Sequence, residues 1–371
     1  MSFLRTAVRP FKRALYPLTS LLLPRATLIR GVLAPGDDPV CVLLVGDGWL
    51  LRTVTGLFAG PVAEVWRTRV PLPLLRSFLR RRGESFGIAF MSPSPMRWRL
   101  FGPSLSHEGR DQVRQVLDLS GGWQQIRSRF SRRLREGTND FERKRGLACR
   151  ISRSAEDFDH FYLRMYLPHA RARFAELAYL ASRDTLRSSF EQGFLLMVEQ
   201  QGRAIAAALC DVRGDTLVFS KSGVLDGDPS HLRAGAEVAI YYFMIRYALQ
   251  LGLRELDCGR GQPFLSDGVV QHKSLWGARL RESGRDEQVF LVAVGKDRAA
   301  ARDFLSRHPI VVSGLQGLDV LAASRATSDA EARDELRNLR TRWRKLGLER
   351  AELLGPDGWQ VHELRGPAGD A

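Results

Sequence analysis

The chain has 371 residues and a formal net charge of +15, with 56 Lys and Arg against 41 Asp and Glu. This length leaves room for two domains with full hydrophobic cores, and the composition is that of a soluble globular protein. The positive charge predicts a polyanionic partner, such as nucleic acid, an anionic membrane surface or a nucleotide-bearing substrate. The four scattered cysteines contain no C-x-x-C pair, which argues against a zinc site and a disulfide framework and predicts a cytoplasmic location.

The range 1–38 is a basic N-terminal segment with no acidic residue before Asp37. Pro10, Pro17 and Pro24 interrupt its apolar residues, so the pattern predicts neither a signal peptide nor a membrane span. Two interpretations stay open. The segment either contacts the inner face of an anionic membrane peripherally, or it packs as an arm on the protein's own surface.

The range 39–122 alternates short apolar runs with turn residues and carries no catalytic motif. The pattern predicts strands at 40–45, 49–54, 64–70, 86–91 and 96–101 and a helix at 74–82. Strands of this modest length beside a helix are typical of an α+β unit.

The range 123–153 is a basic helical connection in which ten residues are Arg or Lys. Five arginines crowd its predicted helix, namely Arg127, Arg129, Arg132, Arg133 and Arg135. This density is consistent with a basic face for phosphates and equally with a solvated helix face.

The range 154–295 has the most regular pattern of the chain. It begins with predicted helices at 155–166 and 184–190, separated by a basic stretch at 167–174. Three apolar runs separated by short turns then predict an antiparallel meander with strands at 194–199, 204–212 and 216–222. One long helix between Asp228 and Gly252 and a strand at 253–258 complete a strand–strand–strand–helix–strand order.

The start of the long helix is a candidate anion site. Asp228-Pro229-Ser230 is typical helix-start chemistry. Arg233 lies in the first turn, where a cation opposes the helix dipole, and His231 lies beside it. Free N–H groups together with these two side chains could hold a phosphate. The alternative is a solvent-facing arginine that pairs with a neighbouring aspartate.

The range 296–371 is predicted to be an appended helical extension. A strand at 288–294 precedes it, and helices are expected at 297–305 and 330–346. The Gly- and Pro-rich stretch from Leu353 onward is expected to be loosely held.

Several of these pieces together resemble the GNAT superfamily of N-acyltransferases, and most closely its FemAB-like and CelD-type branch. Besides the strand order, the matching pieces are SRRLR at 131–135, YLP at 166–168, RARF at 171–174, GVLDGD at 223–228, YYF at 241–243, LDCGR at 256–260, PFLSDG at 263–268, Lys273 and WGA at 276–278. The resemblance implies an α+β fold with mixed central sheets in two GNAT-like halves, the second of which is the acyltransferase domain.

The resemblance also implies an acyl-CoA donor, which is acetyl-CoA in ordinary members, and no metal. Its pyrophosphate would bind at the start of the long helix, with donor contacts from Ser230, His231, Arg233, Gly235 and Arg260. The stretch from Arg233 to Ala236 keeps one glycine of the usual signature. FemAB-like members take aminoacyl-tRNA instead, so tRNA stays open as the donor.

The predicted catalytic residues are Asp257, Lys273 and His231. Lys273 lies in KSLWG, which resembles the K-x-x-[FW]-G segment of FemAB-like enzymes, where a cation could stabilise an oxyanion. Asp257 ends a strand and is the first candidate base, although it could equally hold the glycine loop. Acceptor contacts are expected from Arg171, Arg173 and Tyr166, which lie in the matching pieces.

Three functions remain open at this point. The first is an N-acyltransferase that moves an acyl group from a thioester to a small-molecule or envelope-precursor amine. The second is a FemAB-like aminoacyltransferase that uses charged tRNA, which the basic range 123–153 favours. The third is a non-catalytic GNAT-fold protein that binds anionic lipid or nucleic acid.

Overall fold

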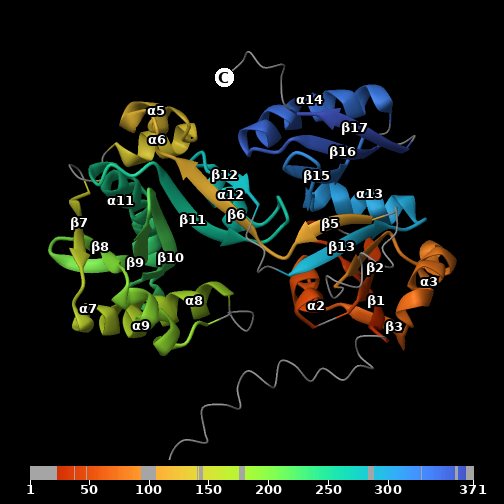
Figure 1. Ribbon diagram of the computed structural model, residues 1–371, viewed down its shortest axis with the longest axis horizontal. Coiled ribbons are helices and arrows are strands. Elements are labelled where there is room, and N and C mark those ends of the chain that lie inside the picture. Colours follow the sequence, from red (N-terminus) through yellow and green to blue (C-terminus); the bar gives the residue numbers. More distant parts are fainter. Residues whose placement is uncertain are drawn as a thin grey trace, which may run out of the picture. The chain divides into compact units, whose positions relative to one another are not determined.

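The computed structural model divides into two compact units (Figure 1). It describes residues 23–36, 38–46, 48–92, 106–139, 141, 145–174, 180–282, 288–326, 328–355 and 358–364. Unit 1 comprises Met1–Val113, Gln262–Asp267 and Glu282–Ala371, and unit 2 comprises Arg114–Gly261 and Gly268–Arg281. In the described ranges no helix is both long and apolar enough to cross a membrane.

Unit 1 is built on a six-stranded sheet in the order β3-β1-β2-β4-β13-β5. The strands are β1 (Arg25–Val32), β2 (Pro39–Val45), β3 (Ala63–Arg69), β4 (Ile88–Met91), β5 (Ser106–Arg110) and β13 (Val289–Val294). Alternate residues of β2 face opposite sides: Val42 and Leu44 join one core cluster, and Leu43 and Val45 join the other. Both faces of this sheet are therefore covered. Helices α2 (Gly48–Thr55), α3 (Leu75–Arg82) and α13 (Arg298–Arg307) belong to the same unit.

Two predictions for the N-terminal part are wrong. β1 lies inside the range predicted to be a basic arm, yet it pairs with β2 on one side and β3 on the other. The apolar run of β1 is short and flanked by arginines, so the sequence pattern did not indicate an interior strand. The predicted strand at 49–54 is helix α2 instead. The predicted strand at 96–101 and residues 1–22 lie outside the described ranges.

A second sheet of unit 1 was missed by the sequence analysis, which expected only helices after residue 296. It contains β14 (Ile310–Ser313), β15 (Leu318–Ala323), β16 (Arg350–Gly355) and β17 (Gly358–Glu363), besides helix α14 (Asp329–Lys345). Asp319 interrupts the apolar run of β15, and only the fold supplies its partner, Arg350, at 2.6 Å. The stretch after Leu353 is thus partly strand rather than loose chain.

His308 is expected to make unit 1 less stable in acid. His308 directly follows α13 and is buried. Its Nδ1 lies 2.7 Å from Ser266 Oγ, and burial lowers its pKa from 6.5 to about 4. Above pH 6.5 the ring is neutral in both the folded and the unfolded chain. As the pH falls toward 4, only the unfolded chain takes up the proton, so the folded state loses stability in this window, by roughly 3 kcal/mol.

Urea unfolding at several pH values checks this expectation. Wild-type protein is expected to lose stability steeply between pH 6.5 and 4, and His308→Asn is expected to lose less over the same window. His107→Asn is the control, because it removes a half-buried histidine from the same unit. Equal pH slopes for wild type and His308→Asn would contradict the assignment.

Unit 2 is built on a seven-stranded sheet in the order β12-β6-β11-β10-β9-β8-β7. The strands are β6 (Val113–Asp118), β7 (Leu147–Ser152), β8 (Phe194–Gln200), β9 (Arg203–Arg213), β10 (Thr216–Val224), β11 (Glu255–Gly261) and β12 (Arg279–Arg281). The predicted meander is confirmed, since β8, β9 and β10 pair antiparallel in turn. β10 then pairs parallel with β11. All three sheets of the described ranges are mixed, which confirms the predicted α+β class with mixed sheets.

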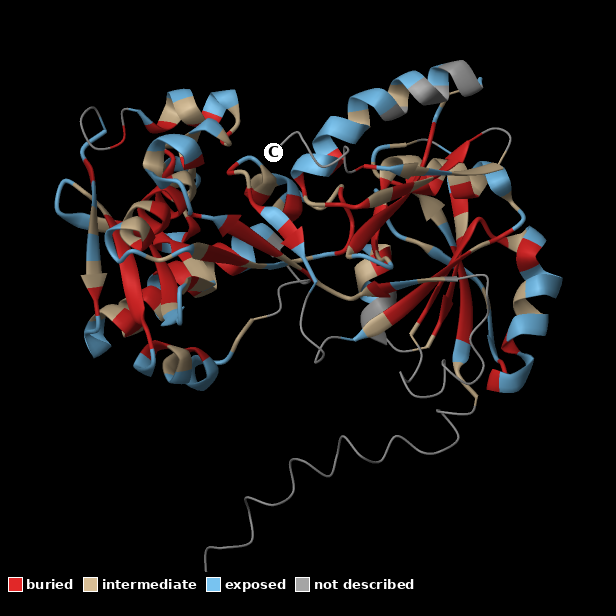
Figure 2. Ribbon diagram, turned by 45° about the horizontal axis from the view of Figure 1, so that its top comes forward, coloured by how far each residue is buried: buried red, intermediate tan, exposed pale blue. Residues whose placement is uncertain are grey.

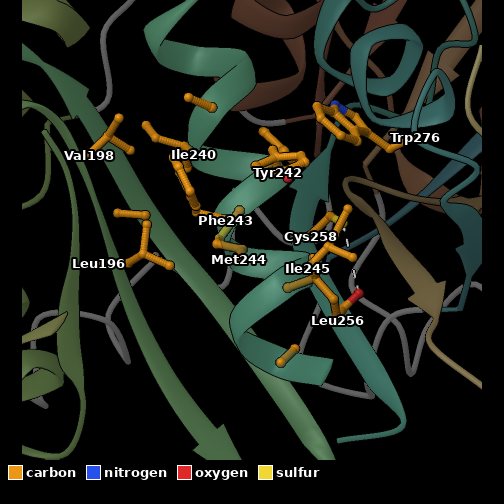
Figure 3. Close-up of a cluster of buried hydrophobic side chains, with 14 of the residues drawn as sticks. Leu196, Val198, Ile240, Tyr242, Phe243, Met244, Ile245, Leu256, Cys258 and Trp276 are labelled. Atoms are coloured by element: carbon orange, nitrogen blue, oxygen red, sulfur yellow. Dashed lines mark hydrogen bonds between the residues drawn. The ribbon is translucent and has the colours of Figure 1, made fainter. Parts of the chain in front are cut away.

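The long predicted helix is broken into two. α10 (Pro229–Arg233) is a single short turn, and α11 (Ala236–Gln250) begins after Gly235, whose φ is +94°. Ile240, Phe243 and Met244 of α11 pack on β8 and β11, as Figure 3 shows for Leu196, Val198 and Leu256. The residues of this cluster are buried, and Figure 2 colours buried residues of the chain red. The remaining helices of unit 2 are α5 (Gly122–Ser128), α6 (Arg132–Thr138), α7 (Ala155–His160), α8 (Leu167–Phe174), α9 (Arg183–Glu191) and α12 (Gly268–Ser274), with a π-helical turn at Phe161–Tyr166.

Candidate functional site

The pairing between β10 and β11 stops partway along both strands. Their register runs from Thr216↔Glu255 to Val218↔Asp257. Immediately afterwards the pairing of β10 with β9 carries an irregularity between Phe219 and Lys221, and Gly259 inside β11 has a φ of +75°. Where two strands stop pairing, their backbone N–H and C=O groups can hydrogen-bond to an extended ligand instead. This interruption is the first part of the candidate site.

Lys273 on α12 lies at the interruption. Its side chain is 2% exposed, and Nζ donates to the carbonyl oxygen of Arg260 at 2.8 Å. Nζ also lies 4.0 Å from the point where a β-carbon on Gly259 would stand. A buried ammonium beside a strand end can stabilise negative charge that develops there. Arg260 itself contributes this carbonyl, and its residue is exposed.

Asp257 stabilises the backbone at Gly259. One carboxylate oxygen accepts from the N–H of Gly259 at 2.9 Å, and the other lies 3.1 Å from Nε of Arg114 on β6. The residue is only 4% exposed. These contacts favour a positioning role for Asp257, and its role as a base stays a prediction.

The start of α11 is the second part of the site. The first intrahelical bond runs from Ala239 N to Gly235 O at 2.8 Å, so the N–H groups of residues 236–238 precede the helical ladder. Among the described residues, none accepts a hydrogen bond from these three groups. Arg145 fixes the preceding turn by donating to Ala234 O at 2.9 Å. Free N–H groups at a helix start favour an anion.

The other residues predicted to bind the acyl donor lie on α10, the short helix that precedes α11. Asp228 caps this turn by accepting from Ser230 N at 2.7 Å, and the same hydrogen bond lowers the pKa of Asp228. An aspartate therefore already occupies the start of α10. Ser230 and Arg233 are exposed and His231 is half-buried, and their donor roles stay predictions. The structure places Gly235, rather than these three, directly at the free N–H groups.

A group of polar residues beside the site was largely missed from the sequence. Tyr241 stacks on Trp276 at 5.6 Å and meets His272 edge-on at 5.1 Å. One turn earlier on α11, Glu237 forms an ion pair with Arg173 of α8. The spacing of Glu237 and Tyr241, four residues apart on one helix face, was the available signal.

Two neighbouring histidines are held in the neutral form. Burial lowers the pKa of His169 on α8, and the nearby Arg173 lowers it further, whereas Glu237 opposes this shift. Burial likewise lowers the pKa of His272. Within the described ranges the buried Nε2 of His272 has no hydrogen-bond partner. The lowered pKa values favour the unprotonated form of both rings at pH 7.

Of the three residues predicted to contact the acceptor substrate, only one reaches the start of α11. Arg173 reaches α11 through Glu237, whereas Arg171 is exposed on α8. Tyr166 belongs to a separate core cluster with Phe158 and Phe161, and its hydroxyl accepts from Ala181 N at 2.8 Å. No group of three or more His, Cys, Asp and Glu in the described ranges is arranged to hold a metal ion.

Four of the five arginines of the basic face at 127–135 make polar contacts within the protein. Arg132 pairs with Glu136 at 2.8 Å, and Arg129 pairs with Asp118 at 3.5 Å. Arg127 and Arg135 donate to backbone carbonyls of these two helices at 2.9 Å each. These contacts favour the solvated-face interpretation over a phosphate-binding face.

Residues 128–268 match the family described as the acetyltransferase (GNAT) domain, which confirms the predicted GNAT resemblance over this range. Among solved structures, the chain is similar to L-PGS from Bacillus licheniformis, at 11% identity and a TM-score of 0.36, covering 72% of this chain and 84% of that one. It is also similar to FemX, at 11% identity and a TM-score of 0.38, covering 71% and 83%. The ribosomal-protein-S18-alanine N-acetyltransferase from Escherichia coli shows 16% identity and a TM-score of 0.27, covering 40% and 98%. No curated protein matches the chain in sequence.

Proposed function

From the GNAT acetyltransferase domain at residues 128–268, we propose that the protein is an N-acyltransferase that uses acyl-CoA and acylates an amine. The observation that carries this proposal is one continuous stretch of chain. It runs from the interrupted ladder of β10 to the free N–H groups at the start of α11. A long donor with amides at one end and phosphates at the other matches this order of binding groups.

The phosphates are proposed to bind at residues 235–238. Three N–H groups and the helix dipole favour negative charge there. Glu237 would oppose an anion, but its ion pair with Arg173 offsets the charge. The amide groups of the donor are proposed to pair along Phe219–Lys221, as an added strand pairs with an open edge.

The acyl carbonyl is proposed to lie at Gly259, beside Lys273. The acceptor nitrogen attacks the carbonyl carbon, the C–N bond forms, and the C–S bond breaks as CoA leaves as a thiolate. The ammonium of Lys273 stabilises the intermediate oxyanion. The amine loses one proton, for which Asp257 and His231 are the proposed acceptors, and the thiolate gains one.

The acceptor is proposed to be a small-molecule or envelope-precursor amine. Arg171, Arg173 and Tyr166 are the proposed acceptor contacts, and Arg173 has the most direct support because it reaches the start of α11. A cytoplasmic location, with peripheral membrane contact, is proposed on the basis of the scattered cysteines and the net charge of +15.

Calorimetric titration of the full chain with acetyl-CoA, free CoA and charged tRNA tests the donor. Saturable binding of both CoA ligands is expected, with little binding of tRNA at high salt. Salt-sensitive tRNA binding without CoA binding would favour an aminoacyltransferase instead. Binding of none of the three would contradict a donor site and favour a non-catalytic protein.

A further inference from the structure

Helix α3 of unit 1 is rich in arginine, and three of its four arginines have no ion partner in the described part of the chain. It carries Arg76, Arg80, Arg81 and Arg82 and no acidic residue. In the described part of the chain, Arg76, Arg80 and Arg81 make no hydrogen bond or ion pair, and all three are exposed. Arg82 lies over the ring of Trp66 at 5.7 Å. Helix α3 therefore presents three exposed arginines whose charge no acidic residue in the described part of the chain offsets.

The inner side of α3 is ordinary core. Leu75 is 4% exposed and belongs to a cluster of unit 1, against which Phe78 and Leu79 also pack. Phe78 meets Trp66 of β3 edge-on at 5.9 Å. The helix is thus anchored firmly on the sheet. The outer side of α3 carries the exposed residues Arg76, Arg80 and Arg81. Figure 1 labels the helix, and Figure 2 colours exposed residues pale blue.

Leu74, which directly precedes α3, is the unexpected feature. It is 57% exposed, although it is a large apolar side chain. Positions 74, 77 and 81 fall on one helical stripe, so Leu74 lies on the same edge of the outer side as Arg81. Arg80 and then Arg76 lie further around the outer side of the helix. An exposed leucine beside unpaired arginines suits a binding partner whose outer layer is anionic and whose next layer is apolar.

We propose that the outer side of α3, with Leu74, Arg76, Arg80 and Arg81, binds the surface of an anionic lipid bilayer. The arginines contact lipid phosphates, and Leu74 enters the acyl boundary. Nucleic acid would pair with the arginines but offers no apolar layer for Leu74. This proposal concerns unit 1 and does not rest on the proposed transferase activity.

Sedimentation of the full chain with vesicles tests the proposal. Binding is expected to phosphatidylglycerol-containing vesicles and not to pure phosphatidylcholine, and it should weaken with salt. Each arginine is expected to contribute about fivefold, so the triple variant Arg76→Gln/Arg80→Gln/Arg81→Gln should bind about 100-fold more weakly. Leu74→Gln should weaken vesicle binding about tenfold.

The matched control is Arg132→Gln/Arg187→Gln/Arg337→Gln. It removes the same charge from helical arginines that pair with an acid three or four residues away. Near wild-type binding by this control supports the assignment to α3. Equal loss in both triple variants would overturn it, because net charge alone would then explain the binding. Tighter binding to duplex DNA than to vesicles, unaffected by Leu74→Gln, would overturn it in favour of a nucleic-acid surface.

Discussion

Lys273→Met is expected to lower kcat about 10²- to 10³-fold while changing KM for acyl-CoA much less. The reason is that Nζ lies beside Gly259, where the carbonyl oxygen would gain negative charge in the transition state but not in the bound donor. Loss of an interaction made only in the transition state lowers kcat and leaves binding nearly intact. Steady-state kinetics with a generic amine acceptor give both constants.

The main competing explanation is structural, because Lys273 also holds the carbonyl of Arg260. Thermal unfolding of Lys273→Met and calorimetric binding of CoA separate the two roles. Lys296→Met is the matched control, because Lys296 is an exposed lysine that pairs with Glu84 at 3.2 Å in unit 1. A Lys273→Met protein with wild-type kcat would remove Lys273 from the chemistry, and one that loses CoA binding and kcat together would assign it to the fold.

Gly235→Ala is expected to weaken CoA binding roughly 10- to 100-fold, which corresponds to the loss of one or two charge-assisted hydrogen bonds. Gly235 has a φ of +94°, and an added β-carbon would stand 3.0 Å from Nη1 of Arg145. A residue with a side chain avoids this backbone conformation, so the turn before α11 should rearrange and its free N–H groups should point elsewhere. Calorimetric titration with CoA measures the effect.

Gly252→Ala is the control for backbone strain. Gly252 follows the other end of α11, has a φ of +70° and has open space where a β-carbon would stand. Both variants should lose about 1 kcal/mol of stability or somewhat more, because both force a side chain into the left-handed region. Only Gly235→Ala should lose affinity for CoA. Equal affinity of the two variants would place the phosphates away from the start of α11.

The regular part of unit 2 could be predicted because each element is long and punctuated. β8, β9 and β10 are apolar runs bounded by short turns, and α11 has a sustained apolar face. The break before α11 could not be predicted, because Asp228-Pro229-Ser230 is a complete helix start in its own right. The structure holds the break with Arg145, which is far from Ala234 in the sequence.

The candidate site shows the same division. The family resemblance indicated Lys273 and Gly235, and the end of a predicted strand indicated Asp257, but neither showed what these residues contact. The partner of Asp257 is Arg114 on β6, a strand that the sequence analysis did not identify. Long-range partners of this kind decide whether a carboxylate is available as a base or holds a turn. Local sequence patterns carry no information about them.

Hydrogen–deuterium exchange with and without CoA tests most directly whether β10 and α11 form one donor site. The account expects CoA to slow exchange in peptides that cover Phe219–Lys221 and the start of α11 at residues 236–238. Exchange at the other end of α11, near Gly252, should not change. Protection that lies elsewhere in the chain at saturating CoA, with these two stretches unaffected, would contradict the proposed site.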